Sequence, residues 1–281
     1  MDKINKFNRI ILEKLSYYLT YHEKDIKGED LQTLIKLGVD ELVAYRILLS
    51  TFMNLKNREI ENLYFDRVIH KFSPNEFENN PYYKTIKWTE TKYKDWELKI
   101  DSYEPYELFV CDDFQYNKNQ VFPQVGYFDK TFKFPAIFQK NRLWMSVTPN
   151  EINTMKEPIE KATGKVLTLG LGLGYYPFMV SNKEDVDSIT IVELDKNVID
   201  LFKKFILPQF PHKEKVNIIH ANAYKYMKKI KDGDYDYIFV DIYHDAGDGL
   251  DVFENLSQYT SRFRITKSDY WILNTIKYYL G

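Results

Sequence analysis

The stretch from Lys165 to Gly174 constrains the fold most, because a short apolar run ends there in three glycines spaced two apart. Val166, Leu167 and Leu169 suit a strand that is covered on both faces. The glycines lack the Cβ atoms that would keep a ligand away from the backbone. The stretch therefore predicts a buried strand that turns sharply into a nucleotide-type ligand site.

A second apolar run, Ile189 to Val192, ends at Glu193, nineteen residues after Gly174. In a doubly wound sheet this is the position of the acid that binds a ribose. An ionised carboxylate is suited to accept hydrogen bonds from both ribose hydroxyls. We therefore expect Glu193 at the ligand site, the alternative being an ordinary surface acid at the end of a strand.

Beyond Pro149 the sequence alternates between candidate strands and amphipathic helices, which predicts an α/β domain over residues 156–281. Its sheet is expected to be doubly wound and mostly parallel, with right-handed crossovers. We expect it to lack the terminal β-hairpin that many such sheets carry, because the sequence ends soon after the fifth strand. The candidate strands cover 166–169, 188–192, 216–220, 237–240 and 270–273.

The first half of the chain has a different pattern. Residues 1–75 are predicted to be helical, since Ile11, Leu15 and Tyr18 recur near the helical period. Residues 76–155 are predicted to be β-rich, because Tyr, Phe and Trp alternate with polar residues there. The helical segment suits equally a substrate lid, a homodimer interface or a module that docks a partner.

Composition gives no sign of a nucleic-acid or membrane partner. The 281 residues carry a formal net charge of only −2, so no basic field draws the chain to nucleic acid or to an anionic membrane. No apolar stretch of about twenty residues is present, and the first residues lack the apolar core of a signal peptide. The single cysteine, Cys111, fits a reducing compartment. We therefore expect a cytoplasmic protein.

The spacing of the glycines limits the kinds of ligand that the turn could bind. Glycines at the first, third and sixth positions would indicate a dinucleotide, but the sixth residue counted from Gly170 is Tyr175. No Gly-Lys-Ser/Thr ending is present, which excludes a phosphate-binding P-loop. The remaining pattern suits a nucleoside with an amino-acid tail, or a tight turn that binds no ligand. No metal site is predicted, because Asp245, Asp248 and Asp251 lack the spacing of a calcium loop.

Four motifs in order carry a resemblance to a known family, namely residues 166–174, 191–195, 220–223 and 235–241. Residues 164–245 resemble the S-adenosylmethionine-dependent methyltransferase superfamily, whose fold is Rossmann-like, and within it the spermidine synthase-like group. The resemblance implies S-adenosylmethionine as the cofactor and Asp241 at the reacting centre. It implies that the cofactor contacts Gly170, Leu171, Gly172, Gly174, Glu193, Leu194, Asn222, Ala223 and Asp241.

Four side chains have two possible interpretations each. Asn222 is placed either to accept a hydrogen bond from the adenine amino group or to cap a helix that starts at Ala223. Asp241 and His244 are the candidate catalytic residues, since either is able to take a proton from an acceptor. The alternatives are a turn cap for Asp241 and a solvated loop histidine for His244. Upstream, Glu151 suits either the amino-acid tail of the cofactor or the start of a helix.

The sequence also departs from its relatives. Residues 241–244 do not match the Asp-Pro-Pro-Tyr motif of amino-group methyltransferases, and residues 242–246 lack the Ser/Thr-Asp-Pro segment with which the synthases bind a polyamine. We therefore expect methyl transfer from S-adenosylmethionine to a nitrogen or oxygen of a small-molecule or protein acceptor that the sequence does not identify. The alternatives are aminopropyl or alkyl transfer of the spermidine synthase type, and a scaffold that binds the cofactor without catalysis.

Overall fold

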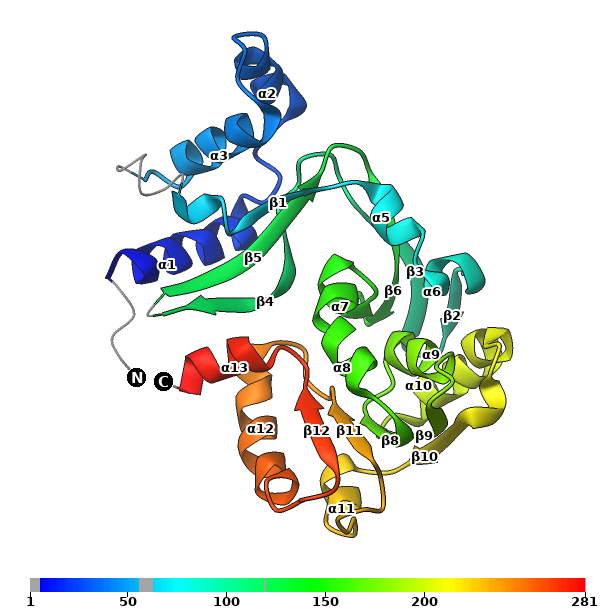
Figure 1. Cartoon of the computed structure of the whole chain (residues 1–281). Helices are drawn as coiled ribbons and strands as arrows, with labels where there is room; N and C mark the ends of the chain where they lie inside the picture. Colours follow the sequence, from blue (N-terminus) through cyan, green and yellow to red (C-terminus); the bar gives the residue numbers. More distant parts are fainter. Residues whose placement is uncertain (1–5, 56–62, 119, 281) are drawn as a thin grey trace. The chain divides into compact units, whose positions relative to one another are not determined.

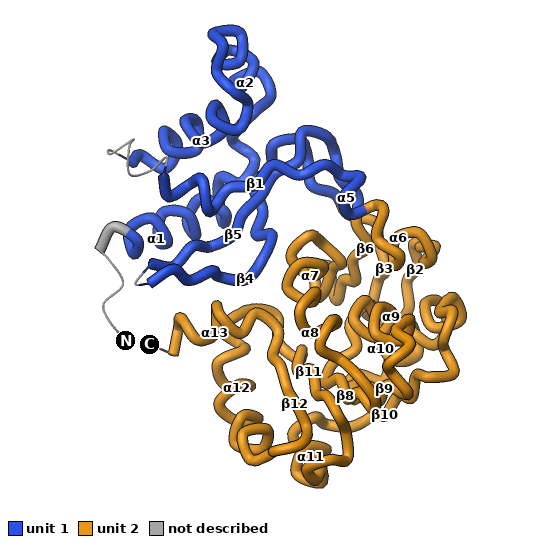
Figure 2. Tube along the Cα trace, viewed as in Figure 1, with its two compact units in different colours: residues 1–77, 102–133 blue, residues 78–101, 134–281 orange. Residues whose placement is uncertain are grey.

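The computed structural model describes residues 6–55, 63–118 and 120–280, which form two compact units. Unit 1 contains residues 1–77 and 102–133, and unit 2 contains residues 78–101 and 134–281 (Figure 2). Both units are discontinuous in sequence, and the β-rich segment predicted for 76–155 contributes strands to each. None of the described helices is both long enough and apolar enough to cross a lipid bilayer.

Unit 1 packs helices around a three-stranded sheet with the order β1-β5-β4. Its elements are α1 (Lys6–Tyr21), α2 (Gly28–Ile35), α3 (Glu41–Phe52), β1 (Ile69–Phe72), β4 (Phe109–Asn117) and β5 (Gln120–Phe128). Asp40 caps α3 by accepting a hydrogen bond from the Leu42 amide at 2.9 Å. Leu15, Leu49 and Tyr127 are buried together in the core of this unit.

The helical prediction for residues 1–75 is wrong at β1. Residues 69–72 form a strand parallel to β5, in which Ile69 is opposite Val125 and Phe72 is opposite Phe128. Four residues are too few to set a period, and their pairing partner lies more than fifty residues away in the sequence. Residues 1–5 and 56–62 of the predicted helical segment lie outside the described residues.

Unit 2 contains a four-stranded sheet of the kind predicted for the β-rich segment. It has the order β2-β3-β6-β7, and the pairs β2–β3 and β6–β7 are antiparallel. The strands are β2 (Thr91–Tyr93), β3 (Trp96–Tyr103), β6 (Phe132–Gln139) and β7 (Arg142–Ser146). Two short helices, α5 (Pro74–Glu78) and α6 (Pro81–Thr85), precede it in the chain.

The second sheet of unit 2 has five strands in the order β10-β9-β8-β11-β12, and every neighbouring pair is parallel (Figure 1). This is the doubly wound α/β sheet that the sequence predicts. The strands are β8 (Gly164–Leu169), β9 (Val186–Glu193), β10 (Val216–His220), β11 (Tyr237–Val240) and β12 (Lys267–Tyr270). The helices are α7 (Pro149–Thr154), α8 (Lys156–Lys161), α9 (Tyr175–Ser181), α10 (Lys196–Leu201), α11 (Ala223–Met227), α12 (Ala246–Thr260) and α13 (Leu273–Leu280). After α10 come a π-helical turn (Phe202–Ile206) and two 3₁₀ turns (Leu207–Gln209 and Lys213–Lys215).

The register of this sheet brings three predicted site residues to one edge. Leu169 of β8 is opposite Val192 of β9 and Val240 of β11. The residues that follow these three, Gly170, Glu193 and Asp241, therefore meet at the carboxyl ends of neighbouring strands. The sheet changes winding direction between β8 and β11, which is where doubly wound sheets bind their ligands.

The fifth strand differs from its prediction. It covers Lys267–Tyr270 instead of 270–273, and Leu273 begins α13. An edge strand has no neighbour on its outer side and tolerates polar residues, so its sequence lacks the apolar run of a central strand. Within the described residues α13 follows β12 directly, without a hairpin strand.

Candidate active site

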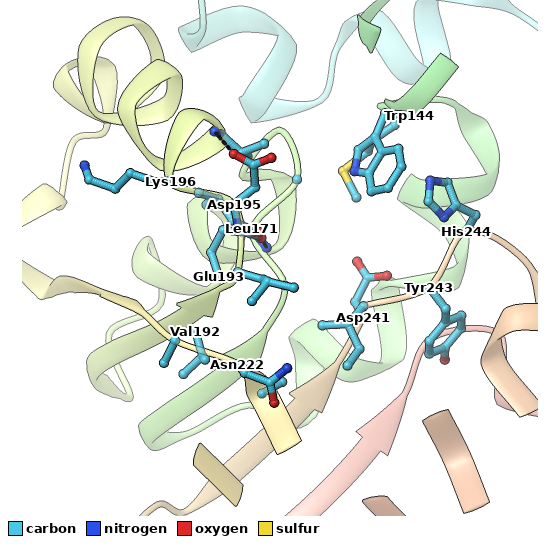
Figure 3. A pocket seen from close by; sticks show the side chains of 18 of the residues that line it. Trp144, Leu171, Val192, Glu193, Asp195, Lys196, Asn222, Asp241, Tyr243 and His244 are labelled. Carbon is cyan, nitrogen blue, oxygen red and sulfur yellow. Dashed lines mark hydrogen bonds between the residues drawn. The ribbon is translucent and has the colours of Figure 1, made fainter. Parts of the chain in front are cut away.

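A cavity of about 590 Å³ lies within unit 2 at the carboxyl ends of β8, β9 and β11 (Figure 3). The five-stranded sheet and its loops form one wall. Trp96, Ile137, Trp144 and Met145 of the four-stranded sheet form another. The two sheets of unit 2 therefore enclose the site together.

The structure brings together at this cavity nine of the ten residues predicted for the site. Gly174 is the exception, because it does not line the cavity. It is the residue before α9, with a φ of +77°, and a Cβ there would collide with the ring of Phe202. Its glycine identity is explained by helix packing, and the ligand contact predicted for it stays a prediction. The nine lining residues are Gly170, Leu171, Gly172, Glu193, Leu194, Asn222, Ala223, Asp241 and His244.

Gly170 and Gly172 are required by protein packing as well as by the turn. Both have positive φ angles, +100° and +51°, which favour glycine. A Cβ on Gly170 would overlap the carbonyl oxygen of Asp241, and one on Gly172 would overlap the sulfur of Met145. The glycines thus let the turn after β8 approach both β11 and β7. Their predicted contact with a ligand stays a prediction.

Glu193 ties the end of β9 to the glycine turn. Its carboxylate accepts hydrogen bonds from the backbone amides of Leu171 at 3.2 Å and Asp195 at 2.7 Å. Burial raises the pKa of Glu193, and these hydrogen bonds oppose that rise. Each carboxylate oxygen has a further lone pair, so the fixed side chain is still able to accept hydrogen bonds from a ligand hydroxyl.

Asp241 follows β11, and its carboxylate points into the cavity (Figure 3). Its backbone amide donates to the Leu169 carbonyl at 2.9 Å, while no described residue donates to its carboxylate, so it does not cap a turn. Burial first, and the negative charge of Glu193 second, raise the pKa of Asp241 to about 7. Glu151 of α7 belongs to the same acidic group, because burial and the charge of Asp241 raise the pKa of Glu151. A carboxylate of this kind binds a cation strongly and takes up protons near neutral pH.

His244 is not a solvated loop histidine. Its ring lies perpendicular to that of Trp144, with 4.0 Å between the ring centroids. Its Nδ1 is 3.5 Å from a carboxylate oxygen of Asp248. Its Nε2 is shielded from solvent and has no hydrogen-bond partner among the described residues.

Asn222 caps α11, which is one of the two roles that the sequence allowed for it. It precedes α11, and its side-chain oxygen accepts a hydrogen bond from the Lys225 amide at 3.1 Å. The residue also lines the cavity, so contact with an adenine remains a prediction.

Sequence reasoning missed the part of the wall that comes from the four-stranded sheet. Trp96 and Trp144 form an edge-to-face pair with 5.6 Å between their centroids. Met145 accepts a hydrogen bond at its sulfur from the Leu173 amide at 3.2 Å. Nothing local distinguishes these residues from the other aromatic and apolar residues of the β-rich segment. The only signal is that Trp144 and Met145 closely precede the first helix of the α/β domain.

Comparisons with known proteins find one matching family model and several similar proteins. The Spermine/spermidine synthase domain family matches residues 151–271. A polyamine aminopropyltransferase from Alkaliphilus oremlandii is 28% identical over 172 residues, which cover 58% of this chain and 59% of that protein. Putrescine N-methyltransferase 1 from Nicotiana tabacum is 31% identical over 96 residues, which cover 32% of this chain and 24% of that protein. The chain thus spans less than two thirds of the length of either relative.

Two solved structures are also similar. Spermidine synthase from Thermotoga maritima matches with a TM-score of 0.36 and 18% identity, over 49% of this chain and 50% of that one. Spermidine synthase in complex with the transition state analogue AdoDATO matches with a TM-score of 0.38 and 19% identity, over 49% of this chain and 51% of that one.

The resemblance to the spermidine synthase-like group is confirmed for the α/β part of the chain. The family match includes the glycine turn, Glu193 and Asp241. The comparisons support a transferase domain of the spermidine synthase type. They support aminopropyl transfer better than the generic methyl transfer that we expected first.

Proposed function

We propose that the protein transfers an aminopropyl or closely related alkyl group from decarboxylated S-adenosylmethionine to an amine nitrogen. The observation that carries this proposal is the charge of the cavity wall. Glu193, Asp195 and Asp241 line it. Among the lining residues, all of them described, Lys196 is the one lysine or arginine, and it forms an ion pair with Asp200 of its own helix.

This charge favours a cationic donor over a zwitterionic one. The methionine carboxylate of S-adenosylmethionine would meet acids that no free lysine or arginine offsets, and like charges repel strongly where water is partly excluded. The decarboxylated donor instead has a cationic amine and a cationic sulfonium. An amine acceptor is also a cation at neutral pH, so the acidic cavity wall attracts both the donor and the acceptor.

The side chains divide the cavity into regions with different tasks. Glu193 accepts hydrogen bonds from the ribose hydroxyls, while Leu194 and Ala223 contact the adenine. Asp241 attracts the sulfonium and the acceptor amine to one point. The sulfonium makes the attached carbon electrophilic, and the protein contributes mainly by holding the amine in line with the bond that breaks.

Methyl transfer from S-adenosylmethionine is the second candidate. The observation that favours it is the segment after Asp241, where residues 242–246 lack the Ser/Thr-Asp-Pro pattern with which the synthases bind a polyamine. The similarity to a putrescine N-methyltransferase is in keeping with this alternative.

Calorimetry with S-adenosylmethionine and its decarboxylated form, followed by mass spectrometry of the products with putrescine, separates the two candidates. We expect the decarboxylated donor to bind at least about tenfold more tightly, which is about 1.4 kcal/mol, and putrescine to gain an aminopropyl group. Asp241→Asn should reduce this preference. Asp187→Asn is the matched control, because Asp187 is exposed near the opposite end of β9. Tighter binding of S-adenosylmethionine with a methylated product would favour the second candidate, and no binding of either donor would refute both.

A further inference from the structure

The cavity has two chemically different sides, with Asp241 between them. Glu193 and Asp195 lie on one side, and Trp144 and His244 lie on the other (Figure 3). The proposed function assigns the donor's ribose to Glu193 and the reacting centre to Asp241. The side with Trp144 and His244 is therefore the one that remains for the body of the acceptor.

Trp144 of β7 presents an apolar surface to this side. It leaves 40% of its surface exposed, whereas Trp96 and Ile137 of the same wall are each 2% exposed. The indole is held by its neighbours, because the ring of His244 lies perpendicular to it at 4.0 Å and Trp96 packs edge-to-face at 5.6 Å between centroids. An indole of fixed orientation is thus available to a hydrocarbon or aromatic group.

The carboxylates of the cavity are not equally available to a cation. Glu193 accepts hydrogen bonds from the amides of Leu171 and Asp195. Asp195 caps α10 and accepts from the Asn197 amide at 2.7 Å. Among the lining residues, each of which lies in the described part of the chain, Asp241 is the one carboxylate that accepts no hydrogen bond from a described residue. An acceptor ammonium therefore has one uncommitted carboxylate to meet.

The other polar groups near the acceptor side are engaged or lie outside the lining. The hydroxyl of Tyr243 donates to the Trp271 carbonyl. The Nδ1 of His244 is 3.5 Å from Asp248, and its Nε2 is shielded from solvent. Asp248 and Glu151 do not line the cavity. This side thus offers an apolar wall and no second carboxylate among its lining residues.

We propose that the acceptor is a monoamine with an apolar body, such as an alkylamine or an arylalkylamine, and that Trp144 selects it. The inference rests on the proposed function, because it takes an amine at Asp241 as the site of transfer. The single ammonium meets Asp241, while the hydrocarbon packs on Trp144. The second ammonium of a diamine would lose water without gaining a carboxylate. A cation–π contact with the indole offsets only part of that loss.

The transfer itself is balanced for such an acceptor. The ammonium first gives one proton to water, which leaves a neutral amine. Its lone pair then forms a new C–N bond to the aminopropyl carbon as the C–S bond breaks, and the bonding electrons pass to sulfur. The sulfonium becomes a neutral thioether, and the product is a secondary ammonium.

The test compares two acceptors of equal length, with decarboxylated S-adenosylmethionine as the donor and mass spectrometry of the products. Pentylamine differs from putrescine only in having a methyl group in place of the second ammonium. We expect kcat/KM to be at least about tenfold higher for pentylamine, because the methyl group leaves water for the indole. Putrescine should react more slowly, through the one amine that meets Asp241.

Variants of Trp144 test which residue sets this preference. Trp144→Glu should reverse it in favour of putrescine, because a second carboxylate then faces the second ammonium. Trp144→Phe should retain it, because an apolar ring remains. Glu254→Gln controls for the change in charge and should leave the ratio of the two kcat/KM values unchanged, since Glu254 is an exposed acid of α12 outside the cavity. This ratio does not depend on the fraction of a variant that is folded.

Three results would overturn the inference. A wild type that uses putrescine at least as well as pentylamine would do so and leave the proposed function intact. Donor binding in calorimetry without transfer to either amine would also overturn it. A Trp144→Glu variant that is active and keeps the wild-type preference would show that Trp144 does not select the acceptor. If the wild type binds neither donor, the proposed function fails first, and the inference fails with it.

Discussion

Asp241→Asn is expected to stabilise the ligand-free protein while it impairs function. The side chain is half-buried in the cavity wall next to Glu193, and its pKa rises from 3.8 to about 7. Each tenfold change in proton affinity is worth about 1.4 kcal/mol, so the ionised group costs at most roughly 4 kcal/mol of folding free energy. Because the cavity is open to water, screening reduces the gain expected from the neutral amide to roughly 2 kcal/mol.

The sign of the pH dependence follows from the direction of the pKa change. The folded protein binds the proton of Asp241 more tightly than the unfolded chain does. The cost of this group is therefore absent below about pH 4, grows as the pH rises between about 4 and about 7, and is complete above that window. The advantage of Asp241→Asn should be full at about pH 8 and less than half as large at about pH 5.

Urea denaturation followed by tryptophan fluorescence measures this directly. All four tryptophans, Trp88, Trp96, Trp144 and Trp271, belong to unit 2, so the signal reports the unit that contains Asp241. Glu254→Gln should change the free energy of unfolding by less than about 0.5 kcal/mol at both pH values. If the Asp241→Asn variant is no more stable than the wild type at about pH 8, the ionised carboxylate of Asp241 does not destabilise the folded protein, and the reasoning is refuted.

Three further substitutions test other parts of the site. Gly172→Ala should lower the free energy of unfolding by about 2 kcal/mol in the same denaturation assay, because the new methyl group meets Met145 at a positive φ; a stable variant would contradict this packing. Glu193→Ala should weaken donor binding by about 1.5–3 kcal/mol in calorimetry, and unchanged affinity would remove Glu193 from the site. Asn222→Ala should cost about 1 kcal/mol of stability through loss of the cap on the Lys225 amide while donor affinity stays within about twofold. A large loss of donor affinity would instead show that Asn222 binds the adenine.

The parallel sheet was predictable because its central strands are buried on both faces. Such strands appear in the sequence as short runs of Val, Ile and Leu, as in β8, and their ends are marked by the glycines and acids that follow. Parallel topology then places those ends at one edge, so Gly170, Glu193 and Asp241 were found together without any tertiary information. The bounds of the edge strand β12 could not be predicted in this way, because its residues are largely polar and form no apolar run.

The partners of the site residues were not predictable in the same way. β1 was assigned to a helical segment because the strand with which it pairs, β5, is distant in the sequence. The packing of Phe202 against Gly174 was not predicted, because the two residues are distant in the sequence. In both cases the deciding contact joins residues that no local pattern connects.

The sequence by itself determined the parallel sheet, the edge at which a ligand binds and the acids at that edge, since burial and strand period are local properties. Only the tertiary structure decided what faces those acids. It brought Trp144 and Met145 of a separate sheet over the glycine turn and placed Trp144 against His244. Contacts of this kind depend on how two sheets pack, and packing joins side chains whose distance in space is unrelated to their distance along the chain.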